Sequence, residues 1–305
     1  MTTSEILHTH DASAVRKGMG RHILSLCQYP AVVANNWTLI ANFFRRDLLG
    51  RFRGSLLGIF WVLVQPIFLF AIYYFVFGFL LGPKTGTGGP DVGFAFYLFS
   101  GIVAFTAMTE STTRSCNVIL ENGNLVKKVA FPCELLPVPN ILVSLIVYAV
   151  GVTVLMSTGL WQSQINPGIE LLVWPLVLVV HCAMCLGLGL LLACLQVLMR
   201  DTFHLYSIGQ QAWFFLSPVF WPLALFEGKL GEHAWVVELN PMYSLIQAHR
   251  YVFGFGGHDY MLHADGTPLP GIWYHLGFAA LWATFFLVIG YSFFMSRKNK
   301  FADLV

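Results

Sequence analysis

The sequence predicts an all-α integral membrane protein with six transmembrane helices. The chain has 305 residues, of which 57% are hydrophobic and only 10% are charged, whereas a soluble domain carries about 25% charged residues. Several runs of about 20 mostly apolar residues are long enough to cross a bilayer. They are continuous rather than alternating, which indicates helices and not a β-barrel. The predicted spans are residues 56–81, 93–113, 138–160, 171–198, 205–226 and 272–295.

The segment before the first span is predicted to contain an amphipathic interface helix, residues 36–54. Its apolar residues recur every three or four positions, so they form one stripe on a helix. A helix with an aromatic face and a basic face next to a span is expected to lie flat in the membrane interface. The alternative is an ordinary juxtamembrane anchor. Residues 1–35 are weakly patterned and are expected to be a partly disordered cytoplasmic segment. The stripe is Trp37, Ile40, Phe44, Leu48 and Phe52, and the charged residues off it are Arg45, Arg46, Asp47, Arg51 and Arg53.

The distribution of basic residues predicts the orientation. If both termini are cytoplasmic, 14 of the 17 Lys and Arg residues lie on the inner side, including the tail at 297–305. This is a strong positive-inside signal. The acidic residues of the loops lean to the outer side. Nothing in this distribution indicates nucleic acid as a partner.

A short charged connector joins the second and third spans. It carries Lys127, Lys128 and Glu134 and is bordered by Pro132 and Pro137. The connector is too short to be a domain, and its charge places it at the cytoplasmic surface. We expect another protein to act on the chain there.

The segment between the fifth and sixth spans, residues 227–271, is unusually long. Pro218 and Pro222 are expected to break the preceding helix near its outer end, and the stretch from Asn240 to Val252 is apolar enough to enter the membrane. Broken helices at membrane depth are tolerated where protein or a water-filled cavity covers them. We therefore expect re-entrant helices here. The alternative is an amphipathic loop on the surface.

The sequence offers almost no catalytic residues. It contains no Gly-x-x-x-x-Gly-Lys-Ser/Thr phosphate loop and no Cys/His cluster at zinc spacing. We therefore expect no catalytic residue, no metal ligand and no bound cofactor in this chain.

Two groups of residues are candidates for a path through the membrane. Glu110 lies within a span and Arg114 follows one turn later, which fits either an ordinary i,i+4 ion pair or a functional site. Aromatic residues make up 15% of the chain. Most are expected to pack or to face lipid, but the flat faces of others suit sliding sugar rings. The aromatic candidates are Trp61, Tyr73, Tyr74 and Phe99.

Several motifs occur in a characteristic order along the chain. They are Arg45-Arg46-Asp47-Leu48, Arg51-Phe52-Arg53-Gly54-Ser55-Leu56-Leu57-Gly58, the connector from Asn124 to Pro137, Arg200-Asp201, Ser217-Pro218 and Asn240-Pro241. With these motifs the chain resembles, over about residues 40–300, the membrane subunits of bacterial ABC-2 type polysaccharide exporters, which export O-antigen, capsule or teichoic acid chains. Cys133 departs from the basic residue that is common in that family.

The resemblance implies a permease subunit in the bacterial inner membrane with its transmembrane domain at residues 55–296. It implies a homodimer that works with two copies of a separate ATP-binding subunit, which would hold ATP and Mg, and a lipid-linked glycan as the cargo among membrane lipids. Rival interpretations are a permease of the same fold for a drug or lipid, a membrane-embedded transferase, and a channel. The cytoplasmic surface that receives the ATPase is expected to comprise Arg45, Arg46, Asp47, Lys127, Lys128, Glu134, Arg200 and Asp201.

Overall fold

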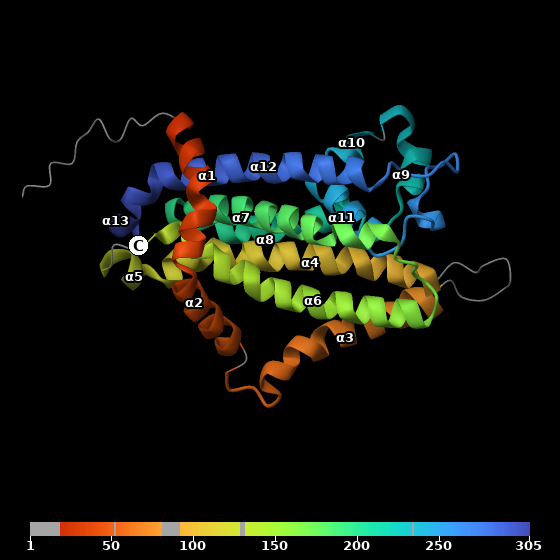
Figure 1. Ribbon diagram of the computed structural model, residues 1–305, viewed down its shortest axis with the longest axis horizontal. Coiled ribbons are helices and arrows are strands. Elements are labelled where there is room, and N and C mark those ends of the chain that lie inside the picture. Colours follow the sequence, from red (N-terminus) through yellow and green to blue (C-terminus); the bar gives the residue numbers. More distant parts are fainter. Residues whose placement is uncertain (1–18, 52, 81–91, 129–131, 234) are drawn as a thin grey trace, which may run out of the picture.

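The computed structural model describes residues 19–51, 53–80, 92–128, 132–233 and 235–305, and in these ranges the chain forms helices and turns but no β-strand. Long helices run side by side and form a bundle (Figure 1). Some residues on which we made predictions lie outside the described ranges, namely 1–18, Phe52 and 129–131. The bundle helices are α3 (Trp61–Tyr73), α4 (Val92–Glu121), α6 (Pro137–Trp161), α7 (Trp174–Leu198), α8 (Thr202–Leu216) and α12 (Ile272–Arg297).

Five helical segments of the described chain are long and apolar enough to cross a membrane. They correspond to the first four predicted spans and the last one. The number of six spans stays a prediction, because the helix in the fifth predicted span has 15 residues. The five segments are Gly58–Leu80, Val92–Glu121, Cys133–Trp161, Ile169–Leu198 and Ile272–Lys300.

The break predicted in the fifth span is present. Helix α8 ends at Leu216, and the next helix, α9 (Leu223–Leu230), starts only after Pro222. Proline has no backbone N–H and its ring clashes with the preceding helical turn, so Pro218 cannot continue α8. A helix of 15 residues is about 22 Å long, which is shorter than the hydrocarbon core of about 30 Å.

Two N-terminal helices lie across one end of the bundle, α1 (Met19–Asn35) and α2 (Trp37–Gly50) (Figure 1). Helix α2 covers residues 37–50 of the interface helix predicted at 36–54. Among the stripe residues that the structure describes, Ile40 is buried whereas Trp37 is 54% exposed. The weak pattern of residues 19–35 did not predict α1. Helix α1 contains Pro30, and proline has a low helix propensity, so the sequence of this segment did not indicate a helix.

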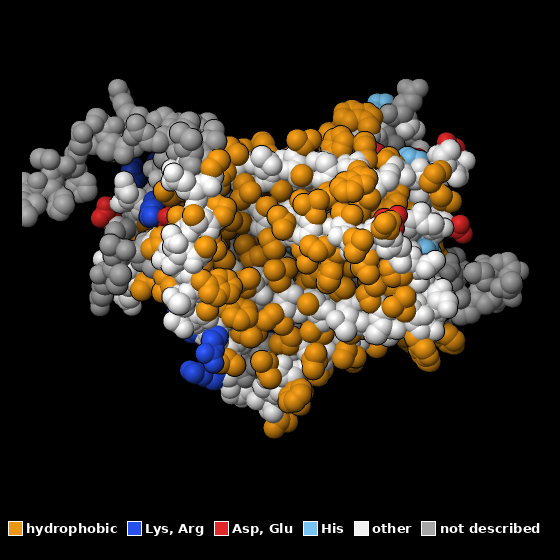
Figure 2. Space-filling model, viewed as in Figure 1, with side chains coloured by type: hydrophobic (Ala, Val, Ile, Leu, Met, Phe, Trp, Pro, Cys, Tyr) orange, Lys and Arg blue, Asp and Glu red, His pale blue; other side chains and the backbone are white. Residues whose placement is uncertain are grey.

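The two ends of the bundle differ in charge. Lys and Arg side chains gather where α1, α2 and α5 (Gly123–Lys128) lie, and acidic and histidine side chains gather at the other end (Figure 2). We call these the basic end and the acidic end. Exposed basic residues of the first are Arg45, Arg46, Lys127 and Arg200, and acidic residues of the second include Glu227, Glu238, Asp259 and Asp265.

Helices α7 and α12 pack closely against each other. A Cβ atom on Gly290 would lie 1.9 Å from the carbonyl oxygen of Gly187, and a Cβ on Gly187 would lie 2.3 Å from the carbonyl carbon of Phe286. Only glycine fits at either position. Small residues let helices in membranes approach closely enough for extensive van der Waals contact.

The predicted re-entrant segment contains α9, α10 (Trp235–Glu238) and α11 (Pro241–Val252). Helix α11 is enclosed at the acidic end by α4, α7 and α12 rather than lying on the surface. The Asn240 side chain caps it by accepting a hydrogen bond from the Met242 N–H at 3.0 Å. The buried position of α11 agrees with the expectation that this segment enters the bundle, and its re-entrant path through a membrane stays a prediction.

Candidate functional site

At the basic end, α2 presents part of the predicted coupling surface. Arg45 and Arg46 are exposed and Asp47 is half-buried. Arg46 donates through Nε to Asp47 Oδ1 at 2.8 Å and through Nη1 to Asn122 Oδ1 at 3.1 Å. Because Asn122 lies between α4 and α5, Arg46 connects the interface helix to the start of the connector.

Within the connector the structure separates two predicted residues. Lys127 is exposed on α5, whereas Glu134 is buried in a short helical turn (Cys133–Leu135). Its carboxylate accepts a hydrogen bond from Lys298 Nζ at 2.6 Å. Glu134 therefore lies inside the protein rather than on an exposed coupling surface. The side chain of Lys128 lies outside the described part of the chain.

The same turn is bonded to α1. The Tyr29 hydroxyl donates to the Glu134 carbonyl oxygen at 2.9 Å, and its ring packs edge-on against Tyr291 at 5.7 Å. Burial, and secondarily the nearby Glu134 carboxylate, raises the pKa of Tyr29 far above its usual range, so the phenol stays a neutral donor. The connector is thus fixed to both α1 and the end of α12.

Arg200 and Asp201 lie in the turn between α7 and α8, and both are exposed. Together with Arg45, Arg46 and Lys127 they make up the exposed part of the predicted coupling surface, and we use the name coupling surface for this exposed set from here on. These residues come from three separate segments of the chain, all at the basic end.

Glu110 lies in an ion-pair cluster. It forms the predicted i,i+4 pair with Arg114, with Nε 3.4 Å from Oε1. It also pairs with Arg51, the residue that follows α2, and this second partner was not predicted. The sequence signal available was the density of basic residues at the end of α2.

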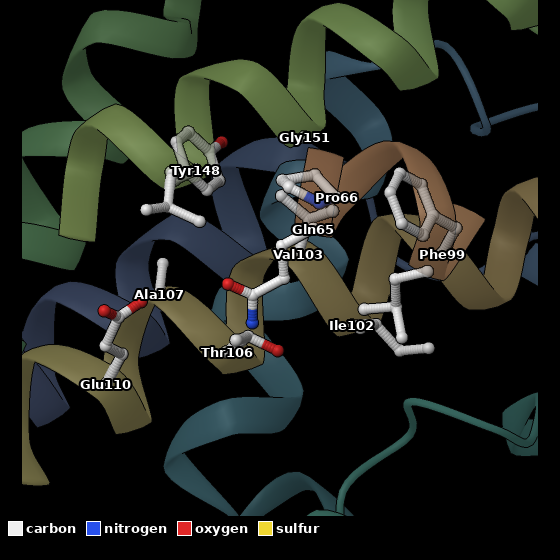
Figure 3. A pocket seen from close by; sticks show the side chains of 12 residues that line it. Gln65, Pro66, Phe99, Ile102, Val103, Thr106, Ala107, Glu110, Tyr148 and Gly151 are labelled. Atoms are coloured by element: carbon white, nitrogen blue, oxygen red, sulfur yellow. The ribbon is translucent and has the colours of Figure 1, made fainter. Parts of the chain in front are cut away.

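Beside Glu110 a cleft separates α3 from α4 and α6 (Figure 3). Its walls are mostly apolar, and Gln65, Thr106 and Glu110 supply its polar atoms. Phe99, a predicted path residue, lies on its wall and is fully buried within the chain. Phe99 therefore lines this cleft but has no exposed surface in this structure.

The other aromatic path candidates lie along the first span. Trp61 is exposed, and Tyr73 and Tyr74 are half-buried. The Tyr74 hydroxyl donates to Gln162 Oε1 at 2.9 Å and so joins the first span to the end of α6. The structure does not gather these residues with Glu110 and Arg114 into a single site.

A second hollow, which we call the α4–α8 groove, was missed by the sequence reasoning. It combines hydroxyl groups of α4 with amides and rings of α8. Thr113 Oγ1 donates to Gln210 Oε1 at 2.9 Å, which joins the two helices, and Gln211 is exposed. The adjacent Gln210-Gln211 pair within an apolar span was the available signal. The lining residues are Phe105, Thr106, Thr109, Gln210, Gln211, Phe214 and Phe215.

Comparison with known proteins agrees with this architecture. The family model described as ABC-2 type transporter matches residues 38–253. The O-antigen export system permease protein RfbA of Myxococcus xanthus is 26% identical over 267 residues, which is 88% of this chain and 95% of that protein. A Klebsiella pneumoniae protein of the same name is 23% identical, over 85% of this chain and 92% of that protein. The polysialic acid transport protein KpsM of Escherichia coli is 22% identical, over 68% and 78%.

Proposed function

The chain belongs to the ABC-2 type transporter family, and from this premise we propose that it is the permease subunit of an ATP-driven exporter that moves a lipid-linked polysaccharide across the bacterial inner membrane. The similar proteins named for O-antigen export and polysialic acid transport, which align over most of this chain, support the cargo class.

The observation that carries the proposal is the α4–α8 groove. Its exposed polar groups, Thr106 and Gln211, lie on apolar helices, where lipid would leave them without hydrogen-bond partners. A glycan supplies such partners through its hydroxyl groups. The rings of Phe214 and Phe215 next to these groups offer apolar faces for sugar rings.

The coupling surface supports a separate ATP-binding subunit as the partner. The full sequence contains no phosphate loop of the Gly-x-x-x-x-Gly-Lys-Ser/Thr type, so ATP and Mg are assigned to that subunit. The guanidinium groups of Arg45 and Arg46 on α2 are suited to bidentate pairing with carboxylates of the ATP-binding subunit. Two copies of this chain would assemble with two copies of the ATPase, both termini of each chain being on the cytoplasmic side.

In this proposal the bonds at the basic end carry the ATPase motion into the bundle. Force on α2 reaches α4 through the Arg46–Asn122 and Arg51–Glu110 contacts. Force on the connector reaches α12 through Glu134 and Lys298. The first span, α4 and the segment containing α11 then line the path, together with α8.

The test is transport by the permease co-purified with its ATP-binding partner and reconstituted in liposomes with a lipid-linked oligosaccharide. Export is measured as accessibility of the sugar to an added glycosidase. We expect Thr106→Val combined with Gln211→Leu, which removes the two exposed polar groups of the groove, to slow export while complex assembly is retained. Thr153→Val, the same change at an exposed site on α6, is the matched control.

The rival cargo of the same fold, a drug or free lipid, gives a different result. A permease for those would show ATP hydrolysis stimulated by the free lipid or drug and unaffected by the oligosaccharide. Equal export by the groove double variant and the wild type would contradict the assignment of the groove.

A further inference from the structure

Helix α11 is bonded at its N-terminal end to the broken end of α8. Asn240 Nδ2 donates to the Leu216 carbonyl oxygen and to Ser217 Oγ, both at 3.1 Å. Its Oδ1 accepts from Trp213 Nε1 at 2.7 Å, besides capping α11. One amide therefore serves both the start of α11 and the last turn of α8.

At the C-terminal end of α11, Arg250 is fully buried. Its Nη2 donates to the carbonyl oxygens of Tyr97 and Val219, both at 3.2 Å. Its Nε and Nη1 donate to Ser100 Oγ at 3.4 Å and to Gln247 Oε1 at 3.3 Å. The guanidinium also lies 3.5 Å from the centre of the Tyr97 ring, which is a cation–π arrangement.

None of the ion pairs formed by the described residues includes Arg250. A buried charge is costly unless it is well compensated, and here the compensation comes from carbonyl oxygens, polar side chains and a ring. Val219 lies in the non-helical stretch after α8, where the carbonyl lacks a helical partner. Arg250 supplies that partner and simultaneously holds α4.

The surroundings are shaped for the guanidinium. A Cβ on Gly101 would lie 2.8 Å from Arg250 Nη2 and 3.3 Å from the Cα of Val219. Only a glycine at this position of α4 lets the arginine and the stretch after α8 come this close.

We propose that Arg250 is a positioning residue that holds the outer end of α8 against α4 and thereby sets the width of the α4–α8 groove at the acidic end. Asn240 makes α11 and the end of α8 one unit, and Arg250 bonds that unit to Tyr97 and Ser100. Opening of the groove at this end requires the Arg250 bonds to α4 to break. The inference rests on the proposed function only in taking the groove as the path.

The test measures the distance between the outer ends of α6 and α8. Spin labels are placed at Trp161→Cys and Leu216→Cys, both exposed positions, with the exposed Cys27 replaced by Ser. Labelled protein is diluted with unlabelled protein in lipid nanodiscs, together with the ATP-binding partner and without nucleotide, so that distances within one chain dominate the double electron–electron resonance signal. Helix α6 serves as the reference because it packs along α4.

Arg250→Met is expected to shift the distance to larger values and to broaden its distribution, and Arg250→Lys to give an intermediate shift. Gly101→Ala keeps the arginine but displaces it, so it should give the same direction of shift in a protein with an unaltered α11. Gly209→Ala, on α8 with nothing within 4 Å of the added Cβ, should match the wild type.

A wild-type distance distribution in folded Arg250→Met and Gly101→Ala, even with a lower melting temperature, would overturn the proposal and leave Arg250 as a packing residue. If Arg250→Met does not fold, Gly101→Ala decides alone. Failure of the wild type to move the lipid-linked oligosaccharide would contradict the proposed cargo but not this distance result.

Discussion

Arg51 and Glu110 form an ion pair that joins the end of the interface helix to the middle of α4, and each side chain is only 15% exposed. Arg114, the second partner of Glu110, is 40% exposed. The partly enclosed Arg51 pair is less screened by solvent than the Arg114 pair. Since Arg46 also bonds to Asn122, α2 is attached to α4 at two points along its length.

Replacing Arg51 by Gln is expected to leave Glu110 with only its weaker partner. Loss of a charged hydrogen-bond partner at a largely buried site costs about 1–3 kcal/mol, and we expect that loss in the free energy of unfolding. Denaturant titration of the purified permease measures it. Arg114→Gln is the matched control and should cost less than Arg51→Gln, since exposed pairs contribute about 0–1 kcal/mol. The reverse order would contradict the assignment of Arg51 as the stronger partner.

Substitution of Gly290 by Ala is expected to force α7 and α12 apart, because the new Cβ would lie 1.9 Å from the Gly187 carbonyl oxygen. Overpacking a close contact costs about 1–3 kcal/mol and sometimes more. The yield of monodisperse protein and its melting temperature should both fall. Gly277→Ala on the same helix, where the added Cβ meets nothing within 4 Å, should be neutral or slightly stabilising. Similar melting temperatures for the two variants would show that the helices do not cross at Gly187.

The Glu134–Lys298 pair is expected to hold the connector in place. Either Glu134→Lys or Lys298→Glu alone should increase protease cleavage in the connector and reduce export per ATP hydrolysed, because two like charges would face each other in a buried site. The double exchange should recover a large part of both losses. Lys300→Glu, at an exposed position nearby, is the control. No recovery in the double variant would mean that the two side chains act independently.

Asn240 offers a way to separate its two functions. Asn240→Asp keeps an acceptor for the Met242 and Trp213 donors but loses the Nδ2 donor to the Leu216 carbonyl. Asn240→Ala loses both the cap on α11 and the bond to α8, and the lost cap alone should lower the free energy of unfolding by about 1–2 kcal/mol. The helical signal in far-ultraviolet circular dichroism and the melting temperature should therefore fall less for Asn240→Asp than for Asn240→Ala. Equal losses would indicate that the bond to α8, rather than the cap, dominates.

The helical architecture could be predicted from the sequence because apolar runs of membrane length are long and continuous signals. Five segments confirm that inference, and the break after Leu216 follows from Pro218. Helix α1 was not predicted, because its apolar pattern is weak and it contains Pro30.

The candidate site was harder to predict, because its contacts join residues far apart in the chain. The pair Glu110–Arg114 follows from one helical turn, but Arg51 reaches Glu110 only through the packing of α2. Glu134 was expected at the coupling surface, but it is buried, and its partner Lys298 lies 164 positions away in the sequence. The carbonyl oxygens that surround Arg250 belong to Tyr97 and Val219, which lie far from it in the sequence, so no local pattern indicates this site.

The length of α4 has a mechanical consequence. This helix has 30 residues without a proline, so it is one continuous helix of about 45 Å without a proline kink. Near its start Tyr97 accepts from Arg250, and just past its end Asn122 accepts from Arg46. A rod has no internal hinge, so a tilt imposed on one end swings the other end in the opposite direction. In the mechanism that we propose, α4 therefore acts as a lever between the coupling surface and the end of the α4–α8 groove that Arg250 holds closed.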